Sequence, residues 1–554
     1  MNNAPRDKVA IGRVLSVSGS EARIGLFADA LQLADSADDA ALTVGKFIGV
    51  ARNRWLLVGI ISQVSTEVPL LVREEGYHAV ASVDLMGQIT SAEITGDAHF
   101  LRGVTCYPAI GDTAVALSTP DLRKIYDIDK SVGVELGCLQ QDTVVKAYAN
   151  IHDMISKHFA ILGSTGVGKS SGLASLLRQI LAVRPDLRIF MLDGHNEYAH
   201  CFGDSALVIN PANLKLPFWL FTFEELLAVI FAGRPGNDEE VEILAELVPL
   251  AKALYHQSRE APIRKRNDGK AADYSIDTPV PYRLKDLLAL IDERMGKLEN
   301  RSSRMNHHWL ITRIEAVSND PRYGFMFTNA NVGGDTMAEI LRHLFRWQPD
   351  GKPMTVMQLA GIPSEVVDAV VSVLCRMAFD FGLWSNGAMP LLFVCEEAHR
   401  YVSADRSLGF QPTRRALSRI AKEGRKYKVF LGLITQRPAE LDATIVSQCS
   451  TLFAMRLAND RDQQLLLAAA SDAATNLLRL LPSLGPREAL AFGAGIPMPT
   501  LFTFPNLPAH FIPRVEAEGS ELVAQTNLNE QVIDSAIERW RGALTAKRML
   551  EGAR

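Results

Sequence analysis

The sequence has few cysteines and few aromatic residues, and it has no long apolar run. Its six cysteines lie far apart in 554 residues without any CxxC pair, which argues against a zinc site or a disulfide framework and fits reduced thiols. The longest apolar stretches have the length of core strands and are too short to span a bilayer. The start of the chain has no apolar stretch behind its charges, unlike a signal peptide. These absences predict a cytoplasmic protein with no membrane partner.

An excess of basic residues is also absent, since the formal net charge is -5. Composition therefore does not indicate a nucleic-acid-binding surface, although a ring-shaped assembly can enclose a basic channel within an acidic exterior. The hydrophobic share of 47% and the charged share of 22% are ordinary for a globular protein. The length is sufficient for more than one domain.

Short β-rich runs separated by turn residues characterise the chain from residue 8 to about residue 130. The predicted strands cover residues 9–16, 21–26, 47–51, 55–63 and 81–89. Short strands with turn signals between them predict a small barrel. The acidic stretch at residues 35–39 is most simply a solvated loop.

The pattern changes from about residue 150. The apolar run Phe159–Leu162 leads into a glycine-rich loop, and residues 171–183 then predict a helix that stops near Pro185. The next apolar run covers residues 187–193, and this strand–loop–helix–strand order predicts a parallel sheet. Further strands are predicted at Leu391–Cys395, Val429–Thr435 and 451–457.

Residues from about 220 to 345 show the apolar spacing of helices. The predicted helices cover residues 223–232, 239–257, 284–300 and 336–345. The segment at residues 259–274 is polar and basic, and it predicts an exposed, mobile loop. Residues 529–550 predict an amphipathic helix near the C-terminal end.

The most specific local motif is a G-x-x-x-x-G-K-S loop, formed by Gly163, Ser164, Thr165, Gly166, Val167, Gly168, Lys169 and Ser170. Its glycines let the backbone bend so that amide N–H groups point at phosphates, and the helix that follows, beginning near Ser171, adds its positive end. We expect Lys169 to reach the β- and γ-phosphates of ATP and Ser170 to ligate Mg²⁺. The alternative, a chance glycine-rich turn, is disfavoured by the strand before the loop and the helix after it.

Two adjacent carboxylates, Glu396 and Glu397, follow the apolar run Leu391–Cys395. This places them at the carboxyl edge of the predicted sheet, where ligands of open α/β sheets bind. We expect Glu396 to hold the magnesium shell through water, and Glu397 to orient or deprotonate the attacking water. The alternative is a solvated pair at the start of a loop.

A second strand, at residues 187–193, also ends in an acid. Asp193 and Glu197 are therefore placed near the nucleotide, where a loop-stabilising role and a catalytic role both remain open.

A basic run follows the acidic strand, with Asp405 and Glu423 as its nearby acids. It consists of Arg406, Arg414, Arg415, Arg419, Lys422, Arg425, Lys426 and Lys428. Such a run is usually a solvated face, but here it could contact DNA phosphates or supply an arginine finger across a subunit interface, with Arg425 as the candidate. Gln436 ends another predicted strand and could sense the γ-phosphate, with a loop-capping amide as the alternative.

Histidines do not predict a metal site. His399 has no second histidine or cysteine at ligand spacing, so a hydrogen-bonded structural role is favoured, and the pair His307 and His308 is equally isolated.

Taken in order, these motifs resemble the HerA family of hexameric ATPases, relatives of the FtsK-type DNA pumps. The resemblance covers about residues 8–515, and the matching segments are 157–163, 193–198 (D-x-x-x-E-Y), 213–219, 396–399 (E-E-A-H), 423–427 (E-G-R-K-Y), 435–438 (T-Q-R-P), 447–449 and 456–457. This ordered combination is much more specific than the phosphate loop alone. One departure is Glu396, where most P-loop enzymes have Asp, and it puts direct magnesium ligation in doubt.

The resemblance implies an α/β fold with a RecA-like P-loop ATPase core. An N-terminal β-barrel, the HAS-barrel of the family, would cover residues 1–135. The core would cover residues 136–220 and 346–515, with a helical bundle inserted at 221–345 and a C-terminal helical brace at 516–554.

The resemblance also implies a homo-hexamer with ATP and Mg²⁺ at each subunit interface. Lys169, Ser170, Glu396 and Glu397 would act in cis, whereas Arg425, and Lys157 as a further candidate, would reach the nucleotide of the neighbour. Double-stranded DNA would pass through the pore. The partner would be a nuclease or a NAD-consuming effector, in DNA end processing or anti-phage defence.

Two functions follow from this pattern. The first is a motor that translocates double-stranded DNA and works with a partner effector. The second is an ATP-switched scaffold that assembles and activates an effector without processive pumping. A nucleotide kinase or a small GTPase fits poorly, because the long helical insertion and the paired carboxylates are not expected there. No nuclease constellation is evident in the sequence, so cutting of DNA is expected of a partner.

Overall fold

The computed structural model describes residues 9–28, 42–52, 55–66, 76–90, 99–129, 131–232, 236–259, 274–328, 330, 334–347, 351–405, 407, 409–470 and 472–514. The chain divides into two compact units. The first unit comprises residues 1–185, 397–399 and 430–512, and the second comprises residues 186–396, 400–429 and 513–554. The expected acidic loop at 35–39, Arg406, the basic segment between residues 260 and 273, and the C-terminal brace at 516–554 lie outside the described residues.

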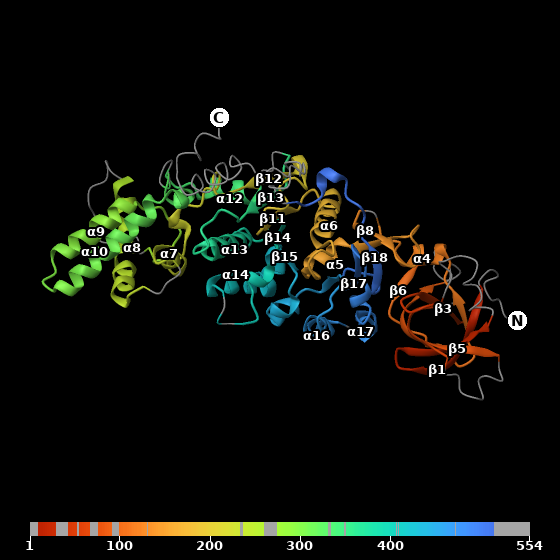
Figure 1. Ribbon diagram of the computed structural model, residues 1–554. Helices are drawn as coiled ribbons and strands as arrows, with labels where there is room; N and C mark the ends of the chain where they lie inside the picture. Colours follow the sequence, from red (N-terminus) through yellow and green to blue (C-terminus); the bar gives the residue numbers. More distant parts are fainter. Residues whose placement is uncertain are drawn as a thin grey trace, which may run out of the picture. The chain divides into compact units, whose positions relative to one another are not determined.

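The first unit begins with a β-barrel, drawn in red and orange in Figure 1. Its strands are β1 (Ala10–Ser18), β2 (Glu21–Phe27), β3 (Phe47–Arg52), β4 (Trp55–Ser65), β5 (Tyr77–Thr90), β6 (Phe100–Arg102) and β7 (Thr113–Ala116). The strand order is β2-β1-β7-β3-β4-β5, and pairing of β5 with β2 closes a ring of six strands, to which β6 is added at β5. All five strands expected from the sequence are present.

The barrel interior is filled by aliphatic side chains because alternate residues of each strand point inward. Fully buried examples are Ile24 and Ile48 at 0% exposure. Burying a side chain of this size contributes about 1.5–3 kcal/mol relative to leaving it in water. The described strands therefore enclose a packed apolar core.

The rest of the first unit is a mixed sheet with helices. After α4 (Thr119–Ile125), its strands are β8 (Gly133–Leu139), β9 (Lys146–Asn150), β10 (Phe159–Leu162), β15 (Val429–Thr435), β16 (Thr451–Ala454), β17 (Glu488–Gly493) and β18 (Thr500–Thr503). Their order is β15-β10-β16-β17-β18-β8-β9. β10 lies parallel to β15 and β16, as expected, whereas the strands beyond β16 pair antiparallel. The antiparallel part was not expected from the sequence.

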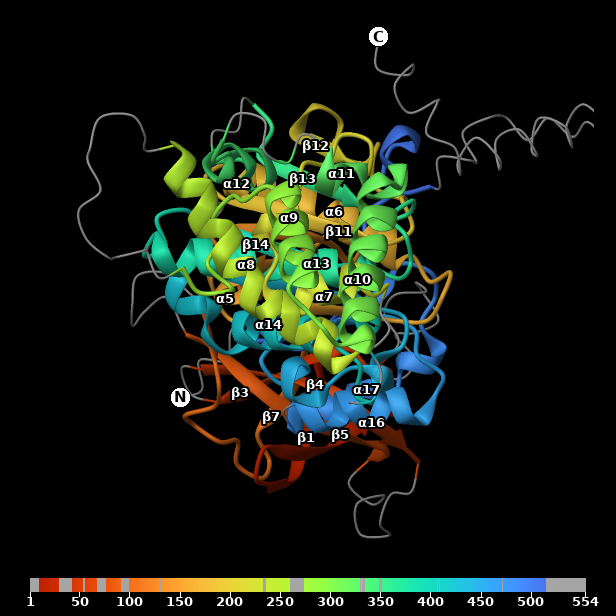
Figure 2. The ribbon, with the colours of Figure 1, turned by 90° about the vertical axis from the view of Figure 1, so that its left-hand side faces the viewer.

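The helices of this unit are α5 (Ile151–Ser156), α6 (Lys169–Val183), α15 (Ala443–Val446), α16 (Asp460–Ala469) and α17 (Asp472–Leu478). Figure 2 shows α17 beside the barrel strand β5, and α16 packs against α17. There Asn476 Nδ2 donates to Asp84 Oδ2 of β5 at 2.9 Å. Arg102 Nη1 of β6 donates to the Gly493 carbonyl at 2.8 Å. These two bonds attach the barrel to the sheet.

The second unit contains a parallel sheet in the order β12-β13-β11-β14. Its strands are β11 (Arg188–Asp193), β12 (Ala206–Ile209), β13 (Met354–Gln358) and β14 (Leu391–Cys395), and its helices at this sheet are α12 (Met337–Phe345), α13 (Val367–Trp384) and α14 (Gln411–Glu423). The sequence predicted β11, β14 and α12, but it did not predict β12, β13 or α13. Most of α13 is buried, so it lacks the one-sided apolar pattern that marks a surface helix.

A helical bundle belongs to the same unit and is drawn in yellow and green at the left of Figure 1. Its helices are α7 (Phe223–Ile230), α8 (Asp238–Arg259), α9 (Leu284–Gly296), α10 (Arg301–Asn319) and α11 (Gly324–Phe327). Figure 2 shows α8, α9 and α10 side by side, and they pack pairwise. The expected helix at 284–300 ends at Gly296, and α10, with Asn300 as its N-cap, is a separate helix that was not expected.

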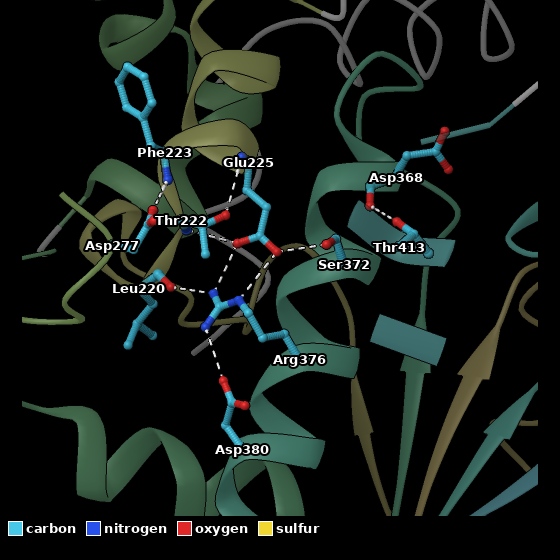
Figure 3. A network of polar contacts seen from close by, with 10 residues as sticks. All are labelled: Leu220, Thr222, Phe223, Glu225, Asp277, Asp368, Ser372, Arg376, Asp380 and Thr413. Atoms are coloured by element: carbon cyan, nitrogen blue, oxygen red, sulfur yellow. Dashed lines mark hydrogen bonds and ion pairs between the residues drawn. The ribbon is translucent and has the colours of Figure 1, made fainter. Parts of the chain in front are cut away.

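A buried ion pair holds the start of the bundle against α13 (Figure 3). Glu225, 1% exposed, accepts hydrogen bonds from Arg376 Nη2 at 2.9 Å, Ser372 Oγ at 2.6 Å and the Thr222 amide at 2.8 Å. Arg376 also donates to the Leu220 carbonyl at 2.7 Å. Each charged group is thus satisfied by several partners, which is the condition under which a buried ion pair is tolerated.

The described helices include none that is both long enough and apolar enough to cross a membrane.

Candidate nucleotide site at the phosphate loop

The phosphate loop connects β10 to α6 in the first unit. β10 is fully buried, and α6 starts at Lys169, so the loop residues 163–168 project beyond the end of the strand. Gly166 and Gly168 have φ values of 75° and 97°, a conformation that residues with a Cβ rarely adopt. No atom lies within 4 Å of the place where a Cβ of Gly166 would be, so the loop is open at this residue. A helix of 15 residues then presents its N-terminal amides to any anion held there.

Hydrogen bonds fix the conformation of the loop. The Ser164 amide and its Oγ both donate to the Arg456 carbonyl, at 2.9 and 3.0 Å. Lys169 Nζ lies across the loop and donates to the Ser164 carbonyl at 2.7 Å. Ser170 and Ser171, in the first turn of α6, are half-buried, and Val167 is buried. The loop is therefore shaped by the chain itself.

The predicted sensor lies next to the loop. Thr165 Oγ1 donates to Gln436 Oε1 at 2.6 Å. Gln436 follows β15, which pairs with β10, so the parallel pairing brings the end of one strand beside the loop that follows the other. This places Gln436 where a terminal phosphate on the loop would be within its reach.

Arg487 also lies against the phosphate loop, although no sequence motif indicated it. Its amide donates to the Val167 carbonyl at 2.8 Å, and its Cγ lies 3.0 Å from the position of a Cβ on Gly168. Its guanidinium donates to the Phe504 carbonyl at 3.1 Å. The residue has a φ of 65°, in the left-handed region. A turn motif in Gly485 and Pro486 precedes it, but nothing local points to a contact with residues 167 and 168.

Glu397 belongs to the same unit as the phosphate loop. It is 7% exposed and has a φ of 48°, which costs a residue with a Cβ about 1–2 kcal/mol. Its Oε2 lies 3.1 Å from His399 Nδ1, and the same nitrogen is hydrogen-bonded to Thr435 Oγ1 at 3.0 Å. The expected hydrogen-bonded histidine is therefore observed at His399.

Glu396 is part of the second unit and is 5% exposed. Its Oε2 accepts a hydrogen bond from the Gly194 amide at 3.2 Å, so it is connected to the turn that follows β11. In that turn, Asp193 Oδ1 accepts from the Glu197 amide at 3.1 Å and Oδ2 accepts from the Tyr198 amide at 3.0 Å. Burial raises the pKa of the Asp193 carboxyl. Of the two open roles for Asp193, this geometry favours stabilisation of the turn.

Glu197 contributes its backbone to the same turn. Its carbonyl accepts from the Arg514 amide at 3.0 Å, and its side chain is half-buried.

The two candidate trans-acting cations are exposed. Arg425 lies in the short helix η6 (Gly424–Tyr427) after α14, and Lys157 follows α5. Among the described residues of the chain, neither side chain has a hydrogen bond or an ion pair.

Several arginines of the basic helix are engaged within the second unit, which corrects the expectation that only Asp405 and Glu423 would face them. Arg415 pairs with Glu224 at 3.1 Å, and Arg419 pairs with Asp380 at 3.6 Å. Arg414 donates to the carbonyls of Ser403 and Asp405. Glu224 and Asp380 belong to other helices of the chain. The acidic residues next to the basic run in the sequence therefore did not reveal these partners. Lys422, Lys426 and Lys428 are exposed.

The described residues contain no group of three or more His, Cys, Asp or Glu residues that could hold a metal ion. His307 is buried, and its Nδ1 is bonded to the Ser303 carbonyl at 2.7 Å.

Comparison with known proteins finds a family model and several relatives that match this chain. Residues 134–378 match a family model described as the central domain of the helicase HerA. The DNA double-strand break repair helicase HerA of Pyrococcus furiosus is 24% identical over 512 residues, which cover 84% of this chain and 86% of the relative. The protein of the same name from Saccharolobus solfataricus is 26% identical over 483 residues, covering 83% and 87%.

Solved structures that match the chain include VirB4 of Thermoanaerobacter pseudethanolicus, with a TM-score of 0.45, 16% identity and coverage of 69% of this chain and 99% of that one. The plasmid coupling protein TrwB in complex with an ATP analogue has a TM-score of 0.42 and 15% identity, with coverage of 72% and 96%. Residues 134–378 thus match the central domain of the helicase HerA, and the chain is an ATPase that is similar to HerA helicases over most of its length.

Proposed function

We propose that this ATPase uses the hydrolysis of Mg-ATP to translocate double-stranded DNA through a homo-hexameric ring, together with a partner nuclease or another effector. The observation that carries the proposal is an intact phosphate loop in the same compact unit as the buried carboxylate Glu397. DNA as the moving substrate is supported by the relative from Pyrococcus furiosus, which is named as a DNA double-strand break repair helicase.

The residues present fit ATP and Mg²⁺. The open loop at Gly166, the amides from Gly163 to Ser171 and the Lys169 ammonium form a site for two or three phosphates. Ser170 would ligate the magnesium directly and Glu396 through water. When bound, the metal ion supplies positive charge that neutralises the phosphate oxygens.

Glu397 and Gln436 would complete the reaction centre. Glu397 would hold the attacking water and accept its proton, which is the role that a buried carboxylate at this edge of the sheet can perform. Gln436, held against Thr165 of the phosphate loop, would contact the γ-phosphate. Arg425 and Lys157 are exposed and would complete the site of the neighbouring subunit, where an arginine stabilises charge on the transferred phosphoryl group.

The effector would dock on the barrel and on the C-terminal segment, because the ring interfaces would occupy the ATPase core. The barrel exposes three large apolar side chains close together in sequence, Leu101, Tyr107 and Ile110, at 41%, 53% and 76%. The effector would be a nuclease or a NAD-consuming enzyme, in DNA end processing or anti-phage defence in the cytoplasm. Cutting of DNA by the purified chain alone would contradict this division of roles.

The experiment that tests the motor is a pair of assays on the purified protein. ATP hydrolysis is measured with and without duplex DNA, and translocation is measured by displacement of a triplex-forming strand from that duplex. DNA-stimulated hydrolysis with ATP-dependent displacement, both abolished by Lys169→Ala, is the expected result. Hydrolysis without displacement on any duplex would overturn the motor.

The second candidate function is an ATP-switched scaffold, favoured by the exposed apolar residues of the barrel. It predicts that effector capture and activation survive Glu397→Gln, which holds ATP without turnover. The motor predicts that capture survives but effector action on long duplex DNA stops.

A further inference from the structure

His399 and Thr435 lie beside the carboxylate of Glu397. His399 Nδ1 is 3.1 Å from Glu397 Oε2 and is hydrogen-bonded to Thr435 Oγ1 at 3.0 Å. The side chains of His399 and Glu397 are 12% and 9% exposed, and Thr435 is fully buried. The three groups therefore form a contact that is largely shielded from water.

The hydrogen bond of His399 Nδ1 is made to Thr435 Oγ1. Glu397 Oε2 lies 3.1 Å from the same nitrogen, so the carboxylate contacts the ring edge but is not the hydrogen-bond partner of Nδ1. A buried ring held in place by a hydroxyl limits the orientations that the adjacent carboxylate can adopt.

Thr435 connects this contact to the predicted sensor. It is the last residue of β15, and its Oγ1 also accepts a hydrogen bond from the Arg437 amide at 3.0 Å. Gln436 lies between Thr435 and Arg437 in the sequence, and its Oε1 accepts a hydrogen bond from Thr165 of the phosphate loop. A chain of contacts therefore runs from the phosphate loop through Gln436 and Thr435 to His399 and Glu397.

A catalytic base must be held within hydrogen-bond reach of its water, and a displacement of about 1 Å can cost 10²-fold in rate. Glu397 is the residue for which this matters, and its side chain has several rotamers unless it is restrained. The left-handed backbone at Glu397 sets the direction of its Cβ but does not by itself fix the orientation of the carboxylate.

We propose that His399 is a positioning residue for Glu397, and that Thr435 holds His399 so that the carboxylate is aligned with the γ-phosphate sensor Gln436. This inference rests on the proposed role of Glu397 in ATP hydrolysis. It assigns His399 a role in the rate of turnover in addition to its structural hydrogen bond.

The test compares His399→Ala with His399→Asn, since the asparagine amide offers an N–H donor near the place of Nδ1. For His399→Ala we expect kcat to fall about 10- to 100-fold with KM for ATP changed little, the range found when a side chain that supports a reacting group is removed. His399→Asn should recover a large part of the loss. Thr435→Val should reproduce the defect more weakly, with Thr435→Ser as its matched control.

A double-mutant cycle separates positioning from general damage. In a Glu397→Gln background, His399→Ala should have no further effect on turnover, because the group it positions is gone. Additive losses, a rise in KM, or loss of nucleotide binding would each assign His399 a merely structural role and overturn the proposal. Absence of hydrolysis in the wild-type protein would instead refute the proposed function.

Discussion

At the scale of single residues, the site depends on a carboxylate with an unfavourable backbone conformation. Glu397 is buried with a φ of 48°. Backbone strain of this kind persists only where the surrounding structure imposes it, and it is common at functional sites. Glu396 precedes it in the sequence but belongs to the second unit, where its carboxylate accepts a hydrogen bond from the Gly194 amide. The two adjacent carboxylates therefore have different surroundings.

Glu397→Gln should separate ATP binding from turnover. The amide keeps the shape of the side chain but cannot accept the proton of the attacking water, so we expect kcat to fall about 10²- to 10⁴-fold while bound nucleotide is retained. Steady-state hydrolysis and equilibrium binding of a fluorescent ATP analogue measure the two quantities. Glu396→Gln is the matched control and should raise the magnesium concentration needed for half-maximal rate. Near-normal turnover in Glu397→Gln would remove this residue from the reaction.

Arg487 supports a second prediction at the residue scale. Its backbone and Cγ lie against the phosphate loop at Gly168, and its guanidinium donates to the Phe504 carbonyl, so we expect its charge to favour phosphates held by the loop. Arg487→Ala should weaken nucleotide binding about tenfold, the loss of one charge-assisted contact. Arg487→Gly, which relaxes the backbone at φ 65°, is the control for strain. Unchanged affinity in both variants would show that only the backbone of this residue matters.

The sequence predicted the parts of the site that are local in the chain. The phosphate loop and the paired acids with His399 are continuous motifs, whereas Arg487 and Thr435 meet them only in the folded sheet. Residue spacing in the sequence does not show that β15 and β10 are neighbours in the sheet. The sequence therefore predicted a role for Gln436 near the phosphate but not its contact with Thr165.

At the scale of elements, prediction succeeded for strands marked by a continuous apolar run or by flanking turns, and it failed for elements that show neither these signals nor a one-sided apolar pattern. β14 and β15 have the predicted bounds, and the barrel strands differ by a few residues. β13 is buried throughout and α13 over most of its length, so neither shows an alternating or one-sided pattern. β17 and β18 depend on pairing with β16 and β8, which lies more than 350 residues earlier in the chain.

The ion pair of Glu225 and Arg376 is expected to stabilise the junction of the bundle with α13. Arg376→Met leaves Glu225 buried without its partner, so we expect a loss of about 3–5 kcal/mol in the free energy of unfolding. Lys297→Met removes a pair that is 73% and 63% exposed, and it should cost less than about 1 kcal/mol. Urea unfolding followed by circular dichroism measures both. Equal small losses would show that the junction is not held by the buried pair.

Lys252 gives the bundle a pH dependence. It is 1% exposed, and its Nζ donates to the carbonyls of Ile276 and Thr278 at 2.5 and 2.8 Å. Burial lowers its pKa to about 8. A base whose pKa is lower in the folded state destabilises the fold while it is charged, so this cost is full below pH 8 and disappears as pH rises toward the ordinary pKa of lysine.

The free energy of unfolding of the wild type should therefore rise by about 2 kcal/mol between pH 7 and pH 9.5, relative to Lys252→Met, in which this ionisation is absent. Urea titrations of both proteins at the two pH values measure the difference. A difference of zero or of opposite sign would show that the ammonium is not destabilised by its burial.

At the scale of the whole molecule, the described chain supplies the phosphate loop and the carboxylate in one unit but exposes Arg425 in the other. An exposed arginine that follows the catalytic strand in sequence is suited to a site on a neighbouring copy. A closed ring in which each interface joins two different faces of the same chain would place one such arginine at every nucleotide.

Complementation in mixed rings tests this arrangement. We expect Lys169→Ala subunits to lose ATP binding but retain Arg425, and Arg425→Ala subunits to bind ATP but lack the proposed finger, so each variant alone should be inactive. Random mixing in equal amounts restores an intact pair at about one quarter of the interfaces, because each must combine a functional loop with a functional finger. ATP hydrolysis measured after subunit exchange should therefore return to about that fraction of the wild-type rate, and Lys422→Ala, an exposed cation on α14, should remain active by itself. If verified mixed rings stay inactive, Arg425 acts within its own subunit, and the nucleotide would not be shared between neighbours through this residue.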